Sequence, residues 1–208
     1  MDVARPYAAA CPTLDGDVLD VLAGTTMSLT GRQVALLTGR TSHSGVLAAL
    51  NRLTEHGLVI RVELNRAHLY ALNRDHLAAP AVEILAEMRQ KLIERMQNTI
   101  GEWRIAPAHV SLFGSTARGD GSTHSDIDLF VVRPSAVDED EPSWRDQIDD
   151  LRDRIRRWTG NHASIIERDE SQLARLRAAQ APIIGELLSD AIVISGSQSQ
   201  LSDLLEAA

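Results

Sequence analysis

Apolar side chains in the first part of the chain recur every three or four residues, which is the spacing of a helix with one buried face. One such stretch begins at Leu14 and stops at Gly24. A second begins at Thr30, which stands three residues before Gln33 as the first residue of a capping box does, and it ends at Gly39. The pattern therefore predicts two successive helices.

A third helix and a change of period follow. Ser42 or Ser44 can cap this helix, and Gly57 ends it. Beyond this glycine apolar and polar residues alternate, which predicts two short antiparallel strands over residues 58–64 and 68–73. The N-terminal segment is thus predicted as three helices followed by a β-hairpin.

This order of elements resembles the winged helix-turn-helix family over residues 14–75, most closely its small bacterial repressors. In that family the third helix enters the major groove of DNA and the hairpin contacts the backbone. Carried over to this chain, the resemblance implies the following DNA-contacting residues: Arg40, His43, Ser44, Asn51, Arg52 and Arg66. Winged helices also dock proteins or form dimers, and residues 1–75 carry seven basic and seven acidic residues. A role without DNA therefore stays open, because DNA favours a positive surface.

Apolar residues continue at spacings of three, four and seven between Val82 and Ile100, and they predict a connecting helix over residues 79–104. Its apolar stripe must be covered, either by the flanking domains or by the same helix of a second copy in a homodimer. Packing within one chain is the simpler arrangement, whereas a palindromic DNA site would favour a dimer.

Two apolar strands enclose a short polar segment within residues 109–132. The first strand ends in Gly114-Ser115, and the second carries Asp126 and Asp128. Alternate side chains of a strand share a face, so the two carboxylates are expected together, where they repel each other. A cation that prefers oxygen ligands, Mg²⁺ or Mn²⁺, would remove that repulsion. Gly114 lets the backbone turn close to a ligand, and Ser115 can hold phosphate oxygens.

Metal-binding carboxylates beside a phosphate-holding turn form a site for attack on a nucleoside triphosphate. Covalent catalysis is not expected, because Cys11 is the single cysteine and the scattered histidines form no Ser-His-Asp set. The lysine-containing phosphate loop is excluded as well, because no Gly-Lys-Ser/Thr sequence occurs.

These residues resemble the polymerase-β-like nucleotidyltransferase superfamily, in its minimal nucleotidyltransferase branch. The family's Gly-Ser-x-x-Arg-Gly motif matches residues 114–119, and its Ser-Asp-x-Asp-Leu motif matches residues 125–129. The resemblance implies transfer of a nucleoside monophosphate from a nucleoside triphosphate, with ATP the expected nucleotide, and release of pyrophosphate. The acceptor can be a protein, an RNA or a small molecule. Similar minimal nucleotidyltransferases act in toxin–antitoxin systems, some of them by modifying a partner protein.

The same resemblance assigns roles to single residues. Gly114 and Ser115 would contact the triphosphate, and the two aspartates would be the catalytic metal ligands. Arg118 would form either a structural ion pair or a phosphate contact. Ser125 belongs to the nucleotide-binding motif, although capping of the turn is the simpler role for its hydroxyl.

The family usually places a third carboxylate on the strand that follows its long helix. Here that strand, residues 163–166, contains no acid, so Glu167 at its end is expected as the third catalytic carboxylate, and Asp169 is the next candidate. Without such a group the domain could bind nucleotide and metal and yet turn over slowly or not at all. A DNA-binding transcription regulator with a nucleotide-sensing or inactive domain is therefore the alternative function.

The remaining pattern predicts an α/β (α+β) fold with a small mixed sheet flanked by helices. Helices are expected over residues 143–159, 171–179 and 182–190, and a last strand over residues 191–195. The nucleotidyltransferase domain is expected over residues 105–196, followed by a C-terminal tail over residues 197–208.

The distribution of charge and the absence of long apolar runs bear on which partners and which location are expected. The net charge is −8, and the acidic excess lies in residues 101–208, which carry 11 basic and 19 acidic residues. That half is therefore not expected to bind nucleic acid in general. Neither a signal peptide nor an apolar run long enough for a membrane span is recognisable, so a cytoplasmic location is expected.

Overall fold

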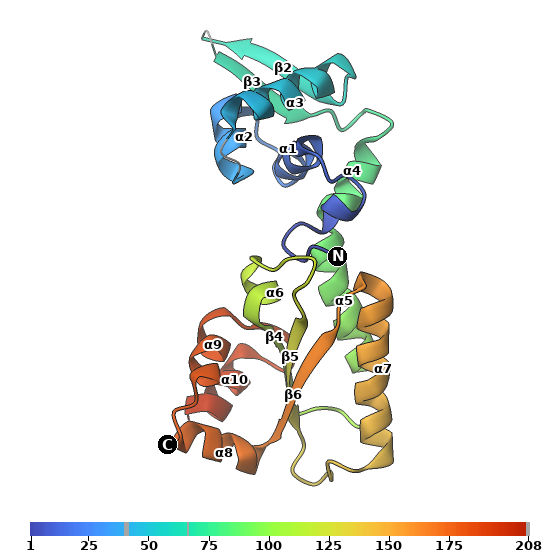
Figure 1. The fold of residues 1–208 in the computed structure, drawn as a ribbon, viewed down its shortest axis with the longest axis vertical. Coiled ribbons are helices and arrows are strands. Elements are labelled where there is room, and N and C mark those ends of the chain that lie inside the picture. Colours follow the sequence, from blue (N-terminus) through green and yellow to red (C-terminus); the bar gives the residue numbers. More distant parts are fainter. Residues whose placement is uncertain (40–41, 66, 207–208) are drawn as a thin grey trace. The chain divides into compact units, whose positions relative to one another are not determined.

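Two units, each built around its own hydrophobic core, make up the chain in the computed structural model (Figure 1). The structure describes residues 1–39, 42–65 and 67–206. The helix–hairpin unit comprises Arg5–Arg89, and the sheet unit comprises Met1–Ala4 together with Gln90–Ala208. The chain therefore leaves the sheet unit after residue 4 and returns to it at residue 90.

The helix–hairpin unit packs helices against a three-stranded antiparallel sheet with the order β1-β3-β2. Its elements are η1 (Pro6–Ala9), α1 (Leu14–Ala23), β1 (Leu29–Thr30), α2 (Gly31–Leu37), α3 (His43–Glu55), β2 (Val59–Leu64), β3 (Ala67–Leu72) and α4 (Ala79–Ala86). The core joins the apolar faces of α1, α2 and α3 to one face of the hairpin. The predicted three helices and hairpin are therefore present, and the short strand β1 is an addition to them.

The helix starts follow the side-chain chemistry that the sequence predicts. The Thr30 hydroxyl accepts a hydrogen bond from the Gln33 amide at 3.3 Å, and the Gln33 side chain accepts one from the Thr30 amide at 2.8 Å. This reciprocal pair confirms the capping box of α2. Of the two serines that could cap α3, Ser42 is the N-cap residue, because its hydroxyl accepts a hydrogen bond from the Gly45 amide at 3.1 Å.

The predicted single connecting helix is wrong, because two helices, α4 and α5 (Met88–Gly101), separate at Glu87. Val82 on α4 belongs to the core of the helix–hairpin unit, whereas Met96 on α5 belongs to the core of the sheet unit. The apolar side chains of one straight helix cannot pack into two separate cores. The break at Glu87 therefore lets α4 pack within the helix–hairpin unit and α5 within the sheet unit. The apolar stripe is thus covered within one chain.

The sheet unit contains a four-stranded mixed sheet with the order β6-β5-β4-β7. After α5 its elements are β4 (His109–Phe113), α6 (Gly114–Arg118), β5 (Ile127–Arg133), α7 (Pro142–Thr159), β6 (Ala163–Asp169), α8 (Glu170–Ala178), α9 (Pro182–Asp190), β7 (Ile192–Ser195) and α10 (Gln198–Glu206). Strands β5 and β6 are parallel, and the other two pairings are antiparallel. The predicted α/β class and mixed sheet are confirmed.

Alternation along β5 divides this sheet into two faces. Leu129 and its alternate neighbours pack against α5 and α7, in the core that also contains Trp144. Phe130 and Val132 point to the opposite face, where α8, α9 and α10 cover the sheet (Figure 1). Side chains of β5 with even numbers therefore share the face of α8–α10.

Two predicted boundaries need correction at the end of the chain. Strand β6 extends to Asp169, three residues beyond its predicted end at residue 166, because its backbone pairs with the whole of β5. Residues 198–206 form α10 instead of a tail, and Leu201 and Leu205 are buried in the core on that side of the sheet. Among the described helices, none combines the length and apolarity that crossing a membrane requires.

Two acidic side chains lie next to each other on α1 of the helix–hairpin unit. The buried Asp17 carboxylate accepts hydrogen bonds from the Tyr7 hydroxyl at 2.7 Å and from the Arg5 guanidinium at 3.1 Å. Asp20 is partly buried one turn later, and its burial, followed by the charge of Asp17, raises its pKa from 3.8 to about 6. The folded unit therefore disfavours the charged form of Asp20.

We predict that Asp20→Asn stabilises the helix–hairpin unit by about 1–2 kcal/mol at pH 7.5. Because the folded state holds this proton more tightly than the unfolded state, wild-type stability falls as the pH rises from about 4 to about 6 and stays low above it. The variant should lose this dependence. Thermal unfolding followed by circular dichroism between pH 4 and 8 measures it, with the exposed Asp75→Asn as a matched control. Equal pH profiles for wild type and Asp20→Asn would contradict the prediction.

Candidate active site

Two carboxylates lie together where β5 begins. Asp126 is exposed and directly precedes the strand, and Asp128 is the second residue of the strand and is partly buried. Burial raises the pKa of Asp128, and the charge of Asp126 raises it further. A hydrogen bond from the Ser164 side chain acts in the opposite direction. The predicted pair is therefore close enough for the two charges to repel each other.

The turn after β4 brings backbone against this pair. Phe113, the last residue of β4, lies opposite Asp128 in the antiparallel ladder, and Gly114 follows with a φ of +69°. A Cβ at Gly114 would lie 2.6 Å from an Oδ atom of Asp128. Glycine therefore meets two requirements here, since it adopts the left-handed backbone without strain and leaves room for the carboxylate.

The polar segment between β4 and β5 is fixed by its own side chains. The Thr116 hydroxyl donates to the Asp126 carbonyl oxygen at 3.2 Å, which ties α6 to the residue before β5. The Ser125 hydroxyl accepts from the Ser122 amide at 2.9 Å, so this serine caps the turn. The exposed Arg118 donates to Asp120 at 3.2 Å and is also near enough to lower the pKa of Asp128. Both roles that the sequence left open for Arg118 are thus compatible with its position.

The first residues of the chain, Met1–Ala4, also support the segment between β4 and β5. The sequence pattern does not predict this contact. Val3 is 1% exposed within the core of the sheet unit, and a Cβ at Gly121 would lie 2.3 Å from its side chain. The buried Asn161 donates to the Ser125 carbonyl oxygen at 2.9 Å and accepts from the Met1 amino group at 2.7 Å. Asn161 thus links the N-terminal segment to the backbone that leads into the aspartate pair.

The structure does not bring Glu167 to the aspartates, so this sequence prediction is corrected. Asp128 lies beside Ser164 in the parallel ladder, whereas Glu167 lies beside Val131, about 10 Å farther along the strand. Val131 belongs to the face covered by α5 and α7, which is opposite to the face of Asp128. A shift of three residues along a strand therefore changes both the distance and the side of the sheet.

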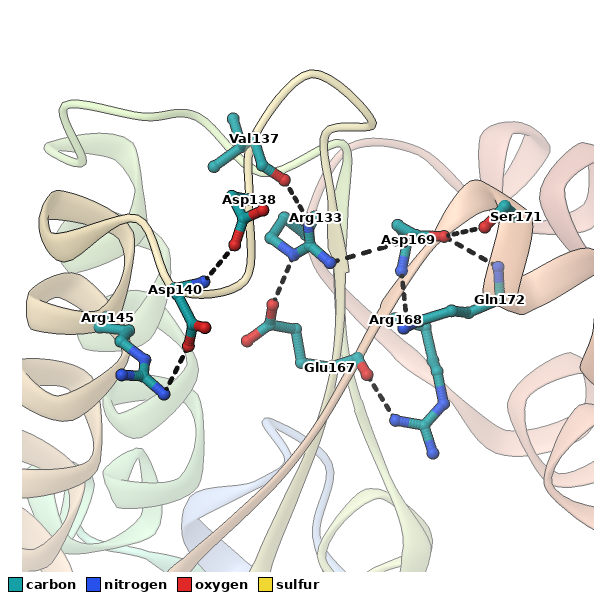
Figure 2. Close-up of polar contacts among 10 residues, drawn as sticks. All are labelled: Arg133, Val137, Asp138, Asp140, Arg145, Glu167, Arg168, Asp169, Ser171 and Gln172. Atoms are coloured by element: carbon teal, nitrogen blue, oxygen red, sulfur yellow. Dashed lines mark hydrogen bonds and ion pairs between the residues drawn. The ribbon is translucent and has the colours of Figure 1, made fainter.

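Glu167 and its neighbour Asp169 are engaged by Arg133 at the far end of β5 (Figure 2). The Arg133 guanidinium is 6% exposed and lies 2.7 Å from Glu167 and 3.4 Å from Asp169. It also donates to the Val137 carbonyl oxygen. Since a buried guanidinium needs anionic partners, these carboxylates serve as structural counter-ions. Neither of the two expected acids therefore lies in the candidate active site.

The side chain beside Asp128 on β6 is that of Ser164 and not an acid. Among the residues that the structure describes, no three His, Cys, Asp or Glu side chains are close enough to hold a metal ion together. The aspartate pair itself fits a divalent cation, because its oxygen donors repel each other in a partly desolvated position. The site therefore offers the aspartate pair with the Ser164 hydroxyl beside Asp128, and the exposed Glu186 of α9 is near enough for its charge to raise the pKa of Asp128 as well.

The side chains predicted to contact DNA are distributed over the helix–hairpin unit. His43, Ser44 and Asn51 are exposed on α3. The Arg52 guanidinium is paired with Asp15 of α1 at 2.5 Å, so part of its charge is neutralised. Arg40 and Arg66 lie outside the described residues.

We predict that Gly114→Ala lowers the stability of the sheet unit by about 1–3 kcal/mol, because the added methyl group strains the backbone and displaces the Asp128 carboxylate. Gly185→Ala on α9 is the matched control, since a Cβ there meets no described atom within 4 Å. This control should raise stability by about 0.5–1 kcal/mol through helix propensity. Urea unfolding followed by tryptophan fluorescence measures both, because Trp103, Trp144 and Trp158 all lie in this unit. Equal effects of the two variants would contradict the role of Gly114.

Comparison with known proteins agrees with this geometry. The model of the nucleotidyltransferase domain family matches residues 90–193, which contain β4, the Gly114 turn, both aspartates and Ser164. No curated protein and no solved structure matches the chain. The family match covers half of the chain and contains the candidate active site. The chain therefore belongs to the nucleotidyltransferase domain family.

Proposed function

We propose that the sheet unit transfers a nucleoside monophosphate from a nucleoside triphosphate, with ATP the expected donor, to a nucleophile on an acceptor molecule. The observation that carries the proposal is the aspartate pair packed against the backbone of the Gly114 turn. The acceptor attacks the α-phosphorus, a new phosphorus–oxygen bond forms, and pyrophosphate leaves with the electrons of the broken bond. This reaction needs charge neutralisation and alignment more than a covalent nucleophile.

Asp126 and Asp128 would hold Mg²⁺ or Mn²⁺. When bound, such a cation neutralises phosphate oxygens and aligns the attacking and leaving groups. The raised pKa of Asp128 supports this role, because a cation relieves the repulsion that raises it. Ser164 donates a hydrogen bond to Asp128 and so orients the carboxylate.

The triphosphate would lie along the Gly114-Ser115 turn. The absence of a side chain at Gly114 lets phosphate oxygens approach the backbone, and Ser115 contributes a hydroxyl. Arg118 is exposed beside this turn, and its present partner Asp120 is also exposed. The ion pair is weak in water, so Arg118 can leave Asp120 for a phosphate oxygen.

We predict that Asp126→Asn and Asp128→Asn each reduce transfer by about 100-fold or more, because one neutral amide removes half of the cation-binding charge. The assay incubates the full chain with ATP, GTP, CTP or UTP labelled at the α-phosphate and Mg²⁺, and follows label on protein, RNA and small molecules of a cell lysate. Labelling of a protein encoded beside this chain would support the toxin–antitoxin interpretation.

Asp146→Asn is the matched control, because Asp146 is an exposed residue of α7 on the opposite side of the sheet. It should transfer label like the wild type. Unchanged transfer by Asp126→Asn and Asp128→Asn would assign the activity to another site.

The hydroxyl at position 164 supports a second candidate function, a regulator whose domain binds nucleotide and does not transfer it. The family usually has a carboxylate on this strand, and here the side chain next to Asp128 is that of Ser164. A serine can orient Asp128 but cannot take up the acceptor proton as a carboxylate does. An acid introduced at position 164 therefore distinguishes a transferase from a regulator that only binds nucleotide.

We predict that Ser164→Asp raises the transfer rate by about tenfold or more, because it supplies a third carboxylate beside Asp128. Without Mg²⁺ the variant should melt at a lower temperature than the wild type, and Mg²⁺ should remove this difference, because a cation that binds only the folded state stabilises it. Ser164→Ala is the control and should gain neither activity nor dependence on Mg²⁺. Transfer by Ser164→Asp with none by the wild type would support the regulator, whereas equal or slower transfer by Ser164→Asp would contradict the prediction.

For the helix–hairpin unit we propose a winged helix. The order helix, strand, helix, helix, strand, strand supports this assignment, as does the exposure of His43, Ser44 and Asn51 on α3. DNA binding stays a prediction of the sequence, and the pairing of Arg52 with Asp15 weakens one of its expected contacts.

A further inference from the structure

One face of the hairpin in the helix–hairpin unit is apolar and uncovered. Ile60, Val62 and Leu64 of β2 are 45%, 51% and 54% exposed, and they share one face because they alternate along the strand. The side chains opposite them on β3 are also apolar, with Leu69 facing Val62. The core of the unit uses the other face of the hairpin, through residues such as Tyr70.

The same strand has a free edge. In the sheet order β1-β3-β2, strand β2 has β3 as its neighbour on one side and no other described strand on the other (Figure 1). An edge strand presents unpaired N–H and C=O groups, and proteins usually protect such an edge with proline, a bulge or inward-pointing charges. Strand β2 has no proline, and its six residues pair with β3 in unbroken register, so neither a proline nor a bulge blocks this edge. Its two charged residues, Arg61 and Glu63, are exposed and lie on the same face as Tyr70.

The two charged residues of β2 are spaced for pairing with a second copy of the strand. In an antiparallel pair of two β2 strands centred on Val62, Arg61 of each copy lies opposite Glu63 of the other. The same register places Ile60 beside Leu64 of the second copy. A pair centred on Arg61 or on Glu63 would instead place two like charges opposite each other. Among the described residues, neither Arg61 nor Glu63 forms an ion pair within the chain, so both charges are available.

We propose that two copies of this chain associate through the free edges of their β2 strands, in antiparallel register about Val62. The two three-stranded sheets then form one continuous sheet across a twofold axis. Backbone hydrogen bonds between the strands supply the attraction, and the Arg61–Glu63 pairs select the register. The apolar rows of the two hairpins become neighbours and shield each other at the centre of the interface. This inference does not depend on the proposed catalytic function.

Charge reversal tests the register in the full-length chain. Analytical ultracentrifugation over a range of protein concentrations should show a monomer–dimer equilibrium for the wild type. R61E and E63R should each weaken dimerisation by about tenfold or more, because each converts two attractive pairs into two repulsive ones. The double variant R61E/E63R restores opposite charges at both pairs, and its dissociation constant should return to within about threefold of the wild type.

Two further variants separate this interface from other surfaces. V62D places two like charges at the twofold axis and should abolish the dimer, whereas L77D, at the 99% exposed Leu77 away from the hairpin, should leave it unchanged. In a C11S background, V62C should form a disulfide-linked dimer under mild oxidation. Circular dichroism verifies that each variant is folded. A wild type that is monomeric at every concentration, or a dimer equally stable in R61E, E63R and R61E/E63R, would overturn the proposal.

Discussion

The carboxylate of Asp128 packs closely against the backbone of Gly114, and the rest of the candidate active site depends on this contact. It requires that β4 and β5 pair with Phe113 opposite Asp128, and that the residue after Phe113 turns with a positive φ. A side chain at position 114 would occupy the space of the carboxylate. The turn proposed to bind phosphate and the acid proposed to bind metal are therefore parts of one local structure, in which each determines the position of the other.

The alternation of β5 places Asp128 on the face opposite to the core that α5 and α7 cover. Residues on one face complete the core with α5 and α7, and Asp128 begins the row on the other face. At the far end of the strand, Arg133 is buried and holds Glu167 and Asp169, which explains why these acids are absent from the candidate active site. Acidic residues of this half of the chain thus lie in two different settings, the proposed cation site at one end of the sheet and the ion pairs of the buried Arg133 at the other.

The division of the chain gives the sheet unit two connections to the helix–hairpin unit. Met1–Ala4 packs within the sheet unit before residues 5–89 form their own core. Through Val3 and Asn161 this short segment supports the backbone that precedes Asp126. In the sequence, the helix–hairpin unit is therefore inserted between the N-terminal segment that supports the candidate active site and the rest of the sheet unit.

Local features of this protein follow from the sequence, because they depend on neighbouring residues. The capping box at Thr30, the helix that ends at Gly160 and the Gly114-Ser115 turn beside two alternating aspartates are all readable from spacing. Features that need distant parts of the chain were decided by the tertiary structure. The register of β6 against β5 selects Ser164 as the neighbour of Asp128 and directs Glu167 to Arg133, and two separate cores break the expected connecting helix at Glu87. Periodicity specifies which residues share a face of one element, but only packing determines which other element that face meets.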